Sequence, residues 1–158
     1  MPANLRSLDN TDRSILKRLQ ADGRLSNRDL AEQINLSSTP CLRRVGMLED
    51  CGVITRYKAV LDPERLGFTV RAFVQVTRSR ESSRERVWEQ LCAIPEVISC
   101  HVVSGEADLL LEIVARDMQH YGDILLERLG KIDGVYDSRS LFSIKSLKLD
   151  GDLPIDAK

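Results

Sequence analysis

Residues 27–46, NRDLAEQINLSSTPCLRRVG, decide the fold of the first part of the chain. Ser26 is a suitable N-cap for a helix that begins at residue 27. Asn35-Leu36 then makes a very short break, and Ser37 is the N-cap of the next helix. Pro40 falls in the first turn of that helix, where its missing N–H costs nothing. Two helices joined by so short a turn predict a helix-turn-helix.

The second helix of this pair has two distinct faces. Cys41, Val45 and Leu48 form an apolar stripe that we expect to point inward. The opposite face begins with small hydroxyl side chains and continues with arginine, which suits contact with bases and phosphates in a major groove. The candidate DNA-contacting residues are Asn27, Ser37, Ser38, Thr39, Leu42, Arg43 and Arg44. The alternative is a plain helical hairpin with a solvated, charged face.

The flanking residues complete a first domain over residues 1–61. Asp9 is a plausible N-cap for a preceding helix, which ends near Asp22-Gly23. Gly52 supplies the C-terminal stop of the last helix. Residues 53–61 are rich in β-formers and predict a strand or small hairpin. The first domain is therefore expected to be a winged helix-turn-helix.

A linker over residues 62–68, punctuated by Pro63 and Gly67, separates this domain from a second one over residues 69–158. Strand and helix signals alternate along the second domain. They fall at 69–77 (strand), 83–94 (helix), 97–103 (strand), 108–115 (strand), 118–129 (helix) and 135–149 (strand). The order βαββαβ predicts a ferredoxin-like fold, so the whole chain belongs to the α+β class.

Two helices cover only one face of such a four-stranded sheet. We expect the other face to expose Val70, Ala72, Val74 or their neighbours, which is too apolar a surface for a stable monomer. Packing two sheets face to face would bury it. The sequence therefore predicts a homodimer.

Composition narrows the class of protein. The chain has 158 residues, of which 42% are hydrophobic and 30% charged, as in ordinary soluble domains. Residues 1–62 carry ten Lys/Arg and eight Asp/Glu, whereas residues 63–158 carry thirteen and sixteen, so the first part is the more basic. The longest apolar stretch is too short to span a bilayer, and the N-terminus has no signal core. We expect a cytoplasmic protein without membrane contact.

Catalytic and metal-binding motifs are missing from the sequence. The four cysteines lack CxxC spacing, and no Ser/His/Asp set, P-loop or GxGxxG is present. We therefore expect neither an enzyme nor a cofactor or metal. The alternative is a ferredoxin-like small-molecule enzyme or metal-handling protein whose helices serve only for assembly.

Several motifs in order resemble the Lrp/AsnC, or feast/famine, family of transcription regulators. The resemblance runs from about residue 8 to residue 155. In the first domain it is carried by Leu8-Asp9, residues 19–24 (LQADGR), Leu36-Ser37, residues 39–41 (TPC) and residues 52–54 (GVI). In the second domain it is carried by residues 104–111 (SGEADLLL), Gly134-Val135 and residues 153–155 (LPI). The TPC run and the end of the chain resemble the leucine-responsive branch more than the asparagine-responsive one.

The resemblance implies a regulator that binds double-stranded DNA and responds to a small amino acid, with dimers that join into octamers. It places the effector near the Ser104–Asp108 turn and the last strand. The candidate effector-binding residues are Ser104, Gly105, Glu106, Asp108, Ser138 and Ser140. From chemistry alone, Asp108 can accept from an ammonium group and a glycine turn can offer backbone N–H groups to a carboxylate. Gly105 and Asp108 are equally common in a simple hairpin turn.

Overall fold

The computed structural model describes residues 8–149 and 151–155, and it divides the chain into two compact units. The first unit comprises Met1–Val60 together with Lys148–Lys158, and the second comprises Leu61–Leu147. The C-terminal residues therefore group with the first unit, whereas the sequence assigned them to the second domain. Two hydrogen bonds between the Leu153 backbone and the Gln20 side chain, one in each direction, explain this difference together with the packing of Ile155 on the helical core.

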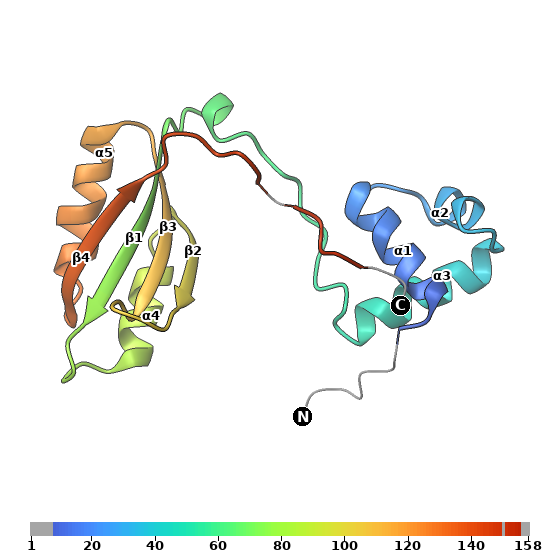
Figure 1. Ribbon diagram of the computed structural model, residues 1–158, viewed down its shortest axis with the longest axis horizontal. Coiled ribbons are helices and arrows are strands. Elements are labelled where there is room, and N and C mark those ends of the chain that lie inside the picture. Colours follow the sequence, from blue (N-terminus) through green and yellow to red (C-terminus); the bar gives the residue numbers. More distant parts are fainter. Residues whose placement is uncertain (1–7, 150, 156–158) are drawn as a thin grey trace. The chain divides into compact units, whose positions relative to one another are not determined.

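The first unit is a bundle of three helices, α1 (Asn10–Ala21), α2 (Asn27–Gln33) and α3 (Ser38–Asp50), drawn in blue to cyan in Figure 1. Local capping defines where they begin. Asp9 and Asp12 form a reciprocal capping box at α1, and the Ser26 hydroxyl accepts from the Asp29 N–H at α2. The core consists of Ile15, Leu16, Leu30, Ala31, Cys41, Val45 and Leu48.

The α2–α3 turn and the end of α3 use left-handed backbone conformations. Asn35 has φ +55° between the two helices, and Gly52 has φ +75° immediately after α3. The Ile54 N–H then donates to the Leu48 carbonyl at 3.0 Å, which closes the helix end. The predicted start, break and stop of the helix-turn-helix are thus confirmed.

The strand or hairpin expected over residues 53–61 is wrong. Residues 55–61 are exposed and have no regular structure. A β-forming sequence becomes a strand only when a neighbouring strand accepts its hydrogen bonds, and the described part of the first unit contains no strand. A short 3₁₀ turn, Glu64–Leu66, follows within the expected linker.

The second unit has the predicted order of elements: β1 (Val70–Arg78), α4 (Arg84–Cys92), β2 (Val97–Val102), β3 (Leu109–Ala115), α5 (Met118–Asp123) and β4 (Val135–Phe142). A π turn and a 3₁₀ turn extend α5 to Lys131. The sheet order is β2-β3-β1-β4 with antiparallel pairing throughout (Figure 1), as a ferredoxin-like fold requires. The last strand ends at Phe142, not at residue 149 as expected.

The helices cover one face of β1. Ala72, Val74 and Val76 are fully buried with residues of α4 and α5. The open face belongs to the alternate residues of β1, among them Arg71 and Phe73. Strand periodicity separates the two faces but does not say which one the helices cover. The exposed residues are the neighbours of Ala72 and Val74, which is the second of the two possibilities that the sequence left open.

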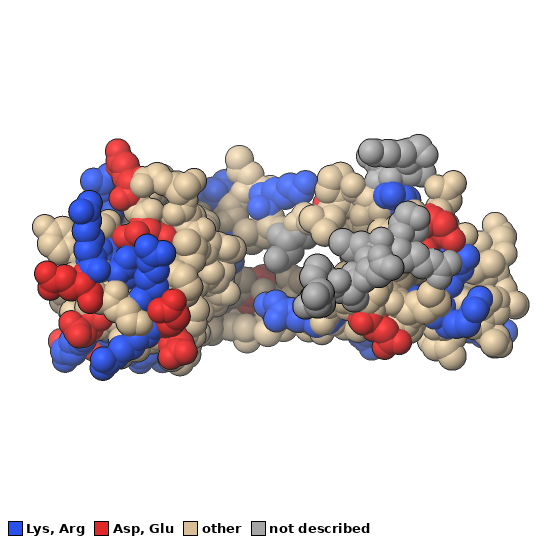
Figure 2. All heavy atoms as spheres, turned by 90° about the horizontal axis from the view of Figure 1, so that it is seen from below, with Lys and Arg blue, Asp and Glu red and all other residues tan. Residues whose placement is uncertain are grey.

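The open face is mixed in character. Phe73, 37% exposed, pairs across to Leu141, 49% exposed. Two residues before Phe73 on the same strand, Arg71 forms an ion pair with Glu112 of β3 at 3.4 Å. Elsewhere on this unit, Figure 2 shows basic and acidic side chains interspersed, without a patch of one sign. An apolar centre beside a charged pair is suited to burial against a surface of matching character.

Candidate DNA-binding face and effector turn

The outer face of α3 is an accessible row of polar side chains with one apolar member. Ser38, Thr39 and Arg43 are exposed, and Leu42 between them is 55% exposed. They point outward because Cys41, Val45 and Leu48 of the same helix are buried in the core, as expected. Hydroxyl and guanidinium groups can donate to base edges and phosphates, and an exposed leucine can contact a thymine methyl group.

Two further candidates lie at helix starts. Asn27 is the exposed first residue of α2, and Ser37 is the exposed N-cap of α3. The Ser37 side chain makes no capping hydrogen bond, in contrast to Ser26. Its hydroxyl is therefore available to another acceptor or donor.

Arg44 does not lie on this outer face, and the phosphate contact expected of it stays a prediction, since its guanidinium already has carboxylate partners. Its Nη1 donates to Asp9 Oδ2 at 2.7 Å and to Asp12 Oδ1 at 2.6 Å. The side chain is 25% exposed, so two carboxylates of α1 already neutralise much of its charge. The Asp12 backbone N–H, followed by Arg44, holds the pKa of Asp9 below its ordinary value. Arg44 locks α3 against the start of α1.

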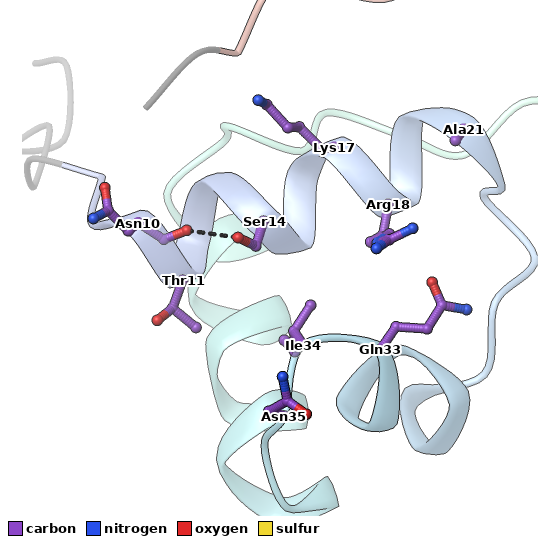
Figure 3. A pocket seen from close by; sticks show the side chains of 9 residues that line it. All are labelled: Asn10, Thr11, Ser14, Lys17, Arg18, Ala21, Gln33, Ile34 and Asn35. Atoms are coloured by element: carbon purple, nitrogen blue, oxygen red, sulfur yellow. Dashed lines mark hydrogen bonds between the residues drawn. The ribbon is translucent and has the colours of Figure 1, made fainter. Parts of the chain in front are cut away.

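A polar hollow of about 550 Å³ lies between α1 and the α2–α3 turn (Figure 3). Within it the Ser14 hydroxyl donates to the Asn10 carbonyl at 2.9 Å. Lys17 and Arg18 contribute its basic side chains, and no acidic side chain lines it. The hollow can therefore accept an anionic group.

The Ser104–Asp108 turn joins β2 to β3 and is exposed at Ser104, Gly105, Glu106 and Asp108. Gly105 has φ +131°, and a Cβ there would meet nothing within 4 Å, so backbone conformation alone requires glycine. Asp108 is exposed in the single chain, so its carboxylate can be reached by a ligand.

Asp108 already has a structural partner that the sequence analysis missed. Its Oδ2 accepts the Arg78 backbone N–H at 2.8 Å, while its own N–H donates to the Val76 carbonyl at 3.0 Å. These bonds attach the turn to the end of β1. Nothing in the sequence pattern identified Arg78, since the two residues are thirty positions apart.

The two serines of β4 differ in their surroundings. Ser138 pairs with Val76, so it lies at the same end of the sheet as the turn, with β1 between them. Ser140 lies two residues further along, and its Oγ is 2.6 Å from the hydroxyl of Tyr121 on α5. Burial raises the pKa of Tyr121. The structure thus brings Ser138 close to the turn region, whereas Ser140 is engaged beneath α5.

Neither a membrane-spanning helix nor a metal site occurs among the residues that the structure describes. No helix there is long and apolar enough to cross a membrane. No group of His, Cys, Asp and Glu in the same residues is arranged to hold a metal ion.

Comparisons with known proteins agree with both units. Residues 8–55 match a winged helix-turn-helix DNA-binding family, and residues 70–153 match the Lrp/AsnC ligand binding domain. The chain is 39% identical to the leucine-responsive regulatory protein of Salmonella typhimurium, over 97% of this chain and 94% of that protein. The corresponding protein of Escherichia coli K12 is 38% identical with the same coverage.

Solved structures agree as well. A transcriptional regulator of Neisseria meningitidis in complex with L-Met superimposes with a TM-score of 0.91 at 38% identity, covering 95% of this chain and 98% of that one. An AsnC family regulator of Agrobacterium tumefaciens superimposes with a TM-score of 0.86 at 36% identity, covering 93% and 97%.

Proposed function

Since the chain belongs to the Lrp/AsnC family of transcription regulators, we propose that the outer face of α3 contacts duplex DNA and that an amino acid at the Ser104–Asp108 turn changes this binding. The proposal rests on the difference between the two faces of α3. Its inner face is buried, Arg44 fixes it to α1, and the outer face remains exposed.

In this proposal Arg43 and the hydroxyl side chains of Ser38 and Thr39 contact base edges, with Leu42 beside them. Asn27 and Ser37, at helix starts, contact the phosphate backbone. A base contact distinguishes sequences, whereas a phosphate contact strengthens binding to all sequences alike. The two groups are therefore separable by experiment.

A mobility-shift assay with the DNA upstream of the gene tests DNA binding. We expect a specific complex that is stronger than the complex with a scrambled duplex by roughly 10³-fold or more. The affinity should fall steeply with salt, because phosphate contacts release counterions. Equal affinity for both duplexes would contradict a sequence-specific regulator.

The effector in this proposal is a small apolar L-amino acid. The relatives named above are leucine-responsive, and the Neisseria regulator was solved with L-Met. Asp108 accepts the Arg78 N–H through Oδ2, and we assign the ligand's ammonium group to Oδ1. The backbone around Gly105 is assigned to the ligand's carboxylate, and Ser104, Glu106 and Ser138 border the same end of the sheet.

A thermal-shift screen of the twenty amino acids identifies the effector, because a ligand that binds only the folded state raises the unfolding temperature. Isothermal titration with leucine and methionine then gives the affinity. A chain that none of the twenty stabilises would require another class of effector.

We also propose that the chain is a homodimer in which the open faces of two sheets meet, with dimers joining into octamers. Phe73 and Leu141 would be the apolar centre of the contact, with Arg71 and Glu112 beside it. Such a dimer presents two copies of α3 to a two-fold symmetric site. We assign its action to the cytoplasm, without a catalytic activity or cofactor.

A further inference from the structure

The C-terminal segment forms a second connection between the two units. The first connection runs from Tyr57, whose hydroxyl donates to Glu49 Oε1 of α3 at 3.0 Å, to Val70 at the start of β1. The second runs from Ser143, which still pairs with Arg71, to Leu153, which is bound to α1.

Leu153 is attached to Gln20 of α1 through its backbone N–H and carbonyl groups. Gln20 Nε2 donates to the Leu153 carbonyl at 3.2 Å, and the Leu153 N–H donates to Gln20 Oε1 at 2.9 Å. One primary amide thus satisfies both groups of one residue, in the manner of a strand pairing. The side chain of Leu153 remains exposed, so the hydrogen bonds do not depend on its identity.

The following residues form one wall of an apolar groove of the first unit. Ile155 packs on the core of α1, α2 and α3. Leu153, Pro154 and Ile155 line one side of a groove of about 1010 Å³, whose other walls include Leu16 and Leu19 of α1 and residues 53–59. A hydrogen-bonded residue followed by a half-buried apolar one that packs on the core is a docked peptide segment.

The two connections differ in reach. An extended chain spans at most about 3.5 Å per residue, so the connection from Tyr57 to Val70 permits a separation of about 45 Å. The connection from Ser143 to Leu153 permits only about 35 Å. While Leu153 is docked, the shorter connection restricts how far the first unit can move from the second.

We propose that the docked segment Leu153–Ile155 is a tether that fixes the separation between the two DNA-binding units of a dimer, and that Gln20 thereby determines which spacing of half-sites is bound. The inference rests on the proposed dimer. A linker that matches the required span gives the highest effective concentration of the second unit at its half-site, and a longer one lowers the selectivity for spacing. Gln20 is a positioning residue here, because it acts through Leu153 and lies outside the proposed DNA-binding face.

The tether is tested by selecting the duplexes that the protein binds from a random library and sequencing them. The sequences give the distance between the two half-sites of each bound duplex. Gln20→Ala releases Leu153. A second variant, with six Gly/Ser residues inserted after Leu147, keeps the docked contact and lengthens the connection. Gln33→Ala is the matched control, since Gln33 is an exposed glutamine at the end of α2.

We expect the wild type and Gln33→Ala to favour one spacing by roughly tenfold over spacings half a helical turn, about 5 base pairs, away. In Gln20→Ala and the insertion variant this preference should fall to roughly twofold, with the half-site sequence unchanged. Amide hydrogen exchange at Leu153 should accelerate in Gln20→Ala but not in the insertion variant.

Wild-type spacing selectivity in the insertion variant would overturn the tether, whether or not Gln20→Ala folds. Selection of single half-sites by the wild type would instead contradict the proposed dimer, and the tether with it. A wild type that selects paired half-sites at many spacings would leave the dimer standing and overturn only the tether.

Discussion

Replacement of Arg44 by alanine distinguishes a structural role of this side chain from a role in DNA contact. Asp12 is only 7% exposed, and Arg44 supplies the charge that faces its Oδ1 at 2.6 Å. Removal of the partner of a buried acceptor costs about 1–3 kcal/mol. Because Arg44 itself is a quarter exposed, we expect a loss toward the lower half of that range.

Amide hydrogen exchange in peptides from α1 and α3 measures this loss locally. Fluorescence is less suitable, since Trp88, the single tryptophan, lies in the second unit. A loss of about 1–2 kcal/mol corresponds to exchange roughly 5- to 30-fold faster in those helices. Arg43→Ala is the matched control. The side chain of Arg43, the residue before Arg44, is exposed, so exchange in this variant should stay within about twofold of the wild type.

The salt dependence of DNA binding supplies the refuting result. If Arg44 acts through α1, the slope of log affinity against log salt should be the same in Arg44→Ala as in the wild type. A slope shallower by about one unit, together with unchanged exchange in α1, would show that Arg44 contacts a phosphate and that the reasoning from its ion pairs is wrong.

The remaining predictions concern one residue each. Gly46→Ala should stabilise α3 by up to about 1 kcal/mol, since a Cβ there meets nothing within 4 Å; faster exchange in α3 would count against this. Asp108→Asn keeps an acceptor for the Arg78 N–H but removes the charge, so titration should show effector affinity reduced by roughly tenfold or more at unchanged thermal stability; wild-type affinity would place the ammonium elsewhere. Phe73→Glu should shift the mass measured by light scattering toward the monomer, and an unchanged oligomer would move the dimer contact off the open face. Because the pKa of Asp9 is lowered in the folded chain, its bond to Arg44 contributes stability fully above the ordinary carboxyl pKa of 3.8. This stability is lost as the pH falls through the lowered pKa. Protection of α1 amides from exchange that already falls near pH 6 would contradict this prediction.

Features that depend on neighbouring residues were predictable from the sequence. The caps at Asp9 and Ser26 and the stop at Gly52 depend on hydrogen bonds across a few positions, and the structure places all three as expected. The order of elements in the second unit follows from periodicity in the same way. The family, expected from ordered motifs, is confirmed by the matches to both units.

Features that depend on distant partners were not predictable. Arg44 pairs with carboxylates more than thirty positions away, so its sequence neighbours suggested a DNA contact. Residues 53–61 have the composition of a strand but lack a described partner strand. Which face of β1 the helices cover, and the return of Leu153 to Gln20, are likewise decided by packing between segments far apart in the chain.

The most direct test of the central claim, that the outer face of α3 contacts base edges, is the affinity of wild type and Arg43→Ala for a selected operator and its single-base variants. We predict that Arg43→Ala weakens binding to the operator by about 1–3 kcal/mol and loses discrimination at one base pair of each half-site, while its affinity for scrambled DNA changes little. Equal weakening on all sequences, or wild-type discrimination at every position, would contradict the assignment of this face to base contact.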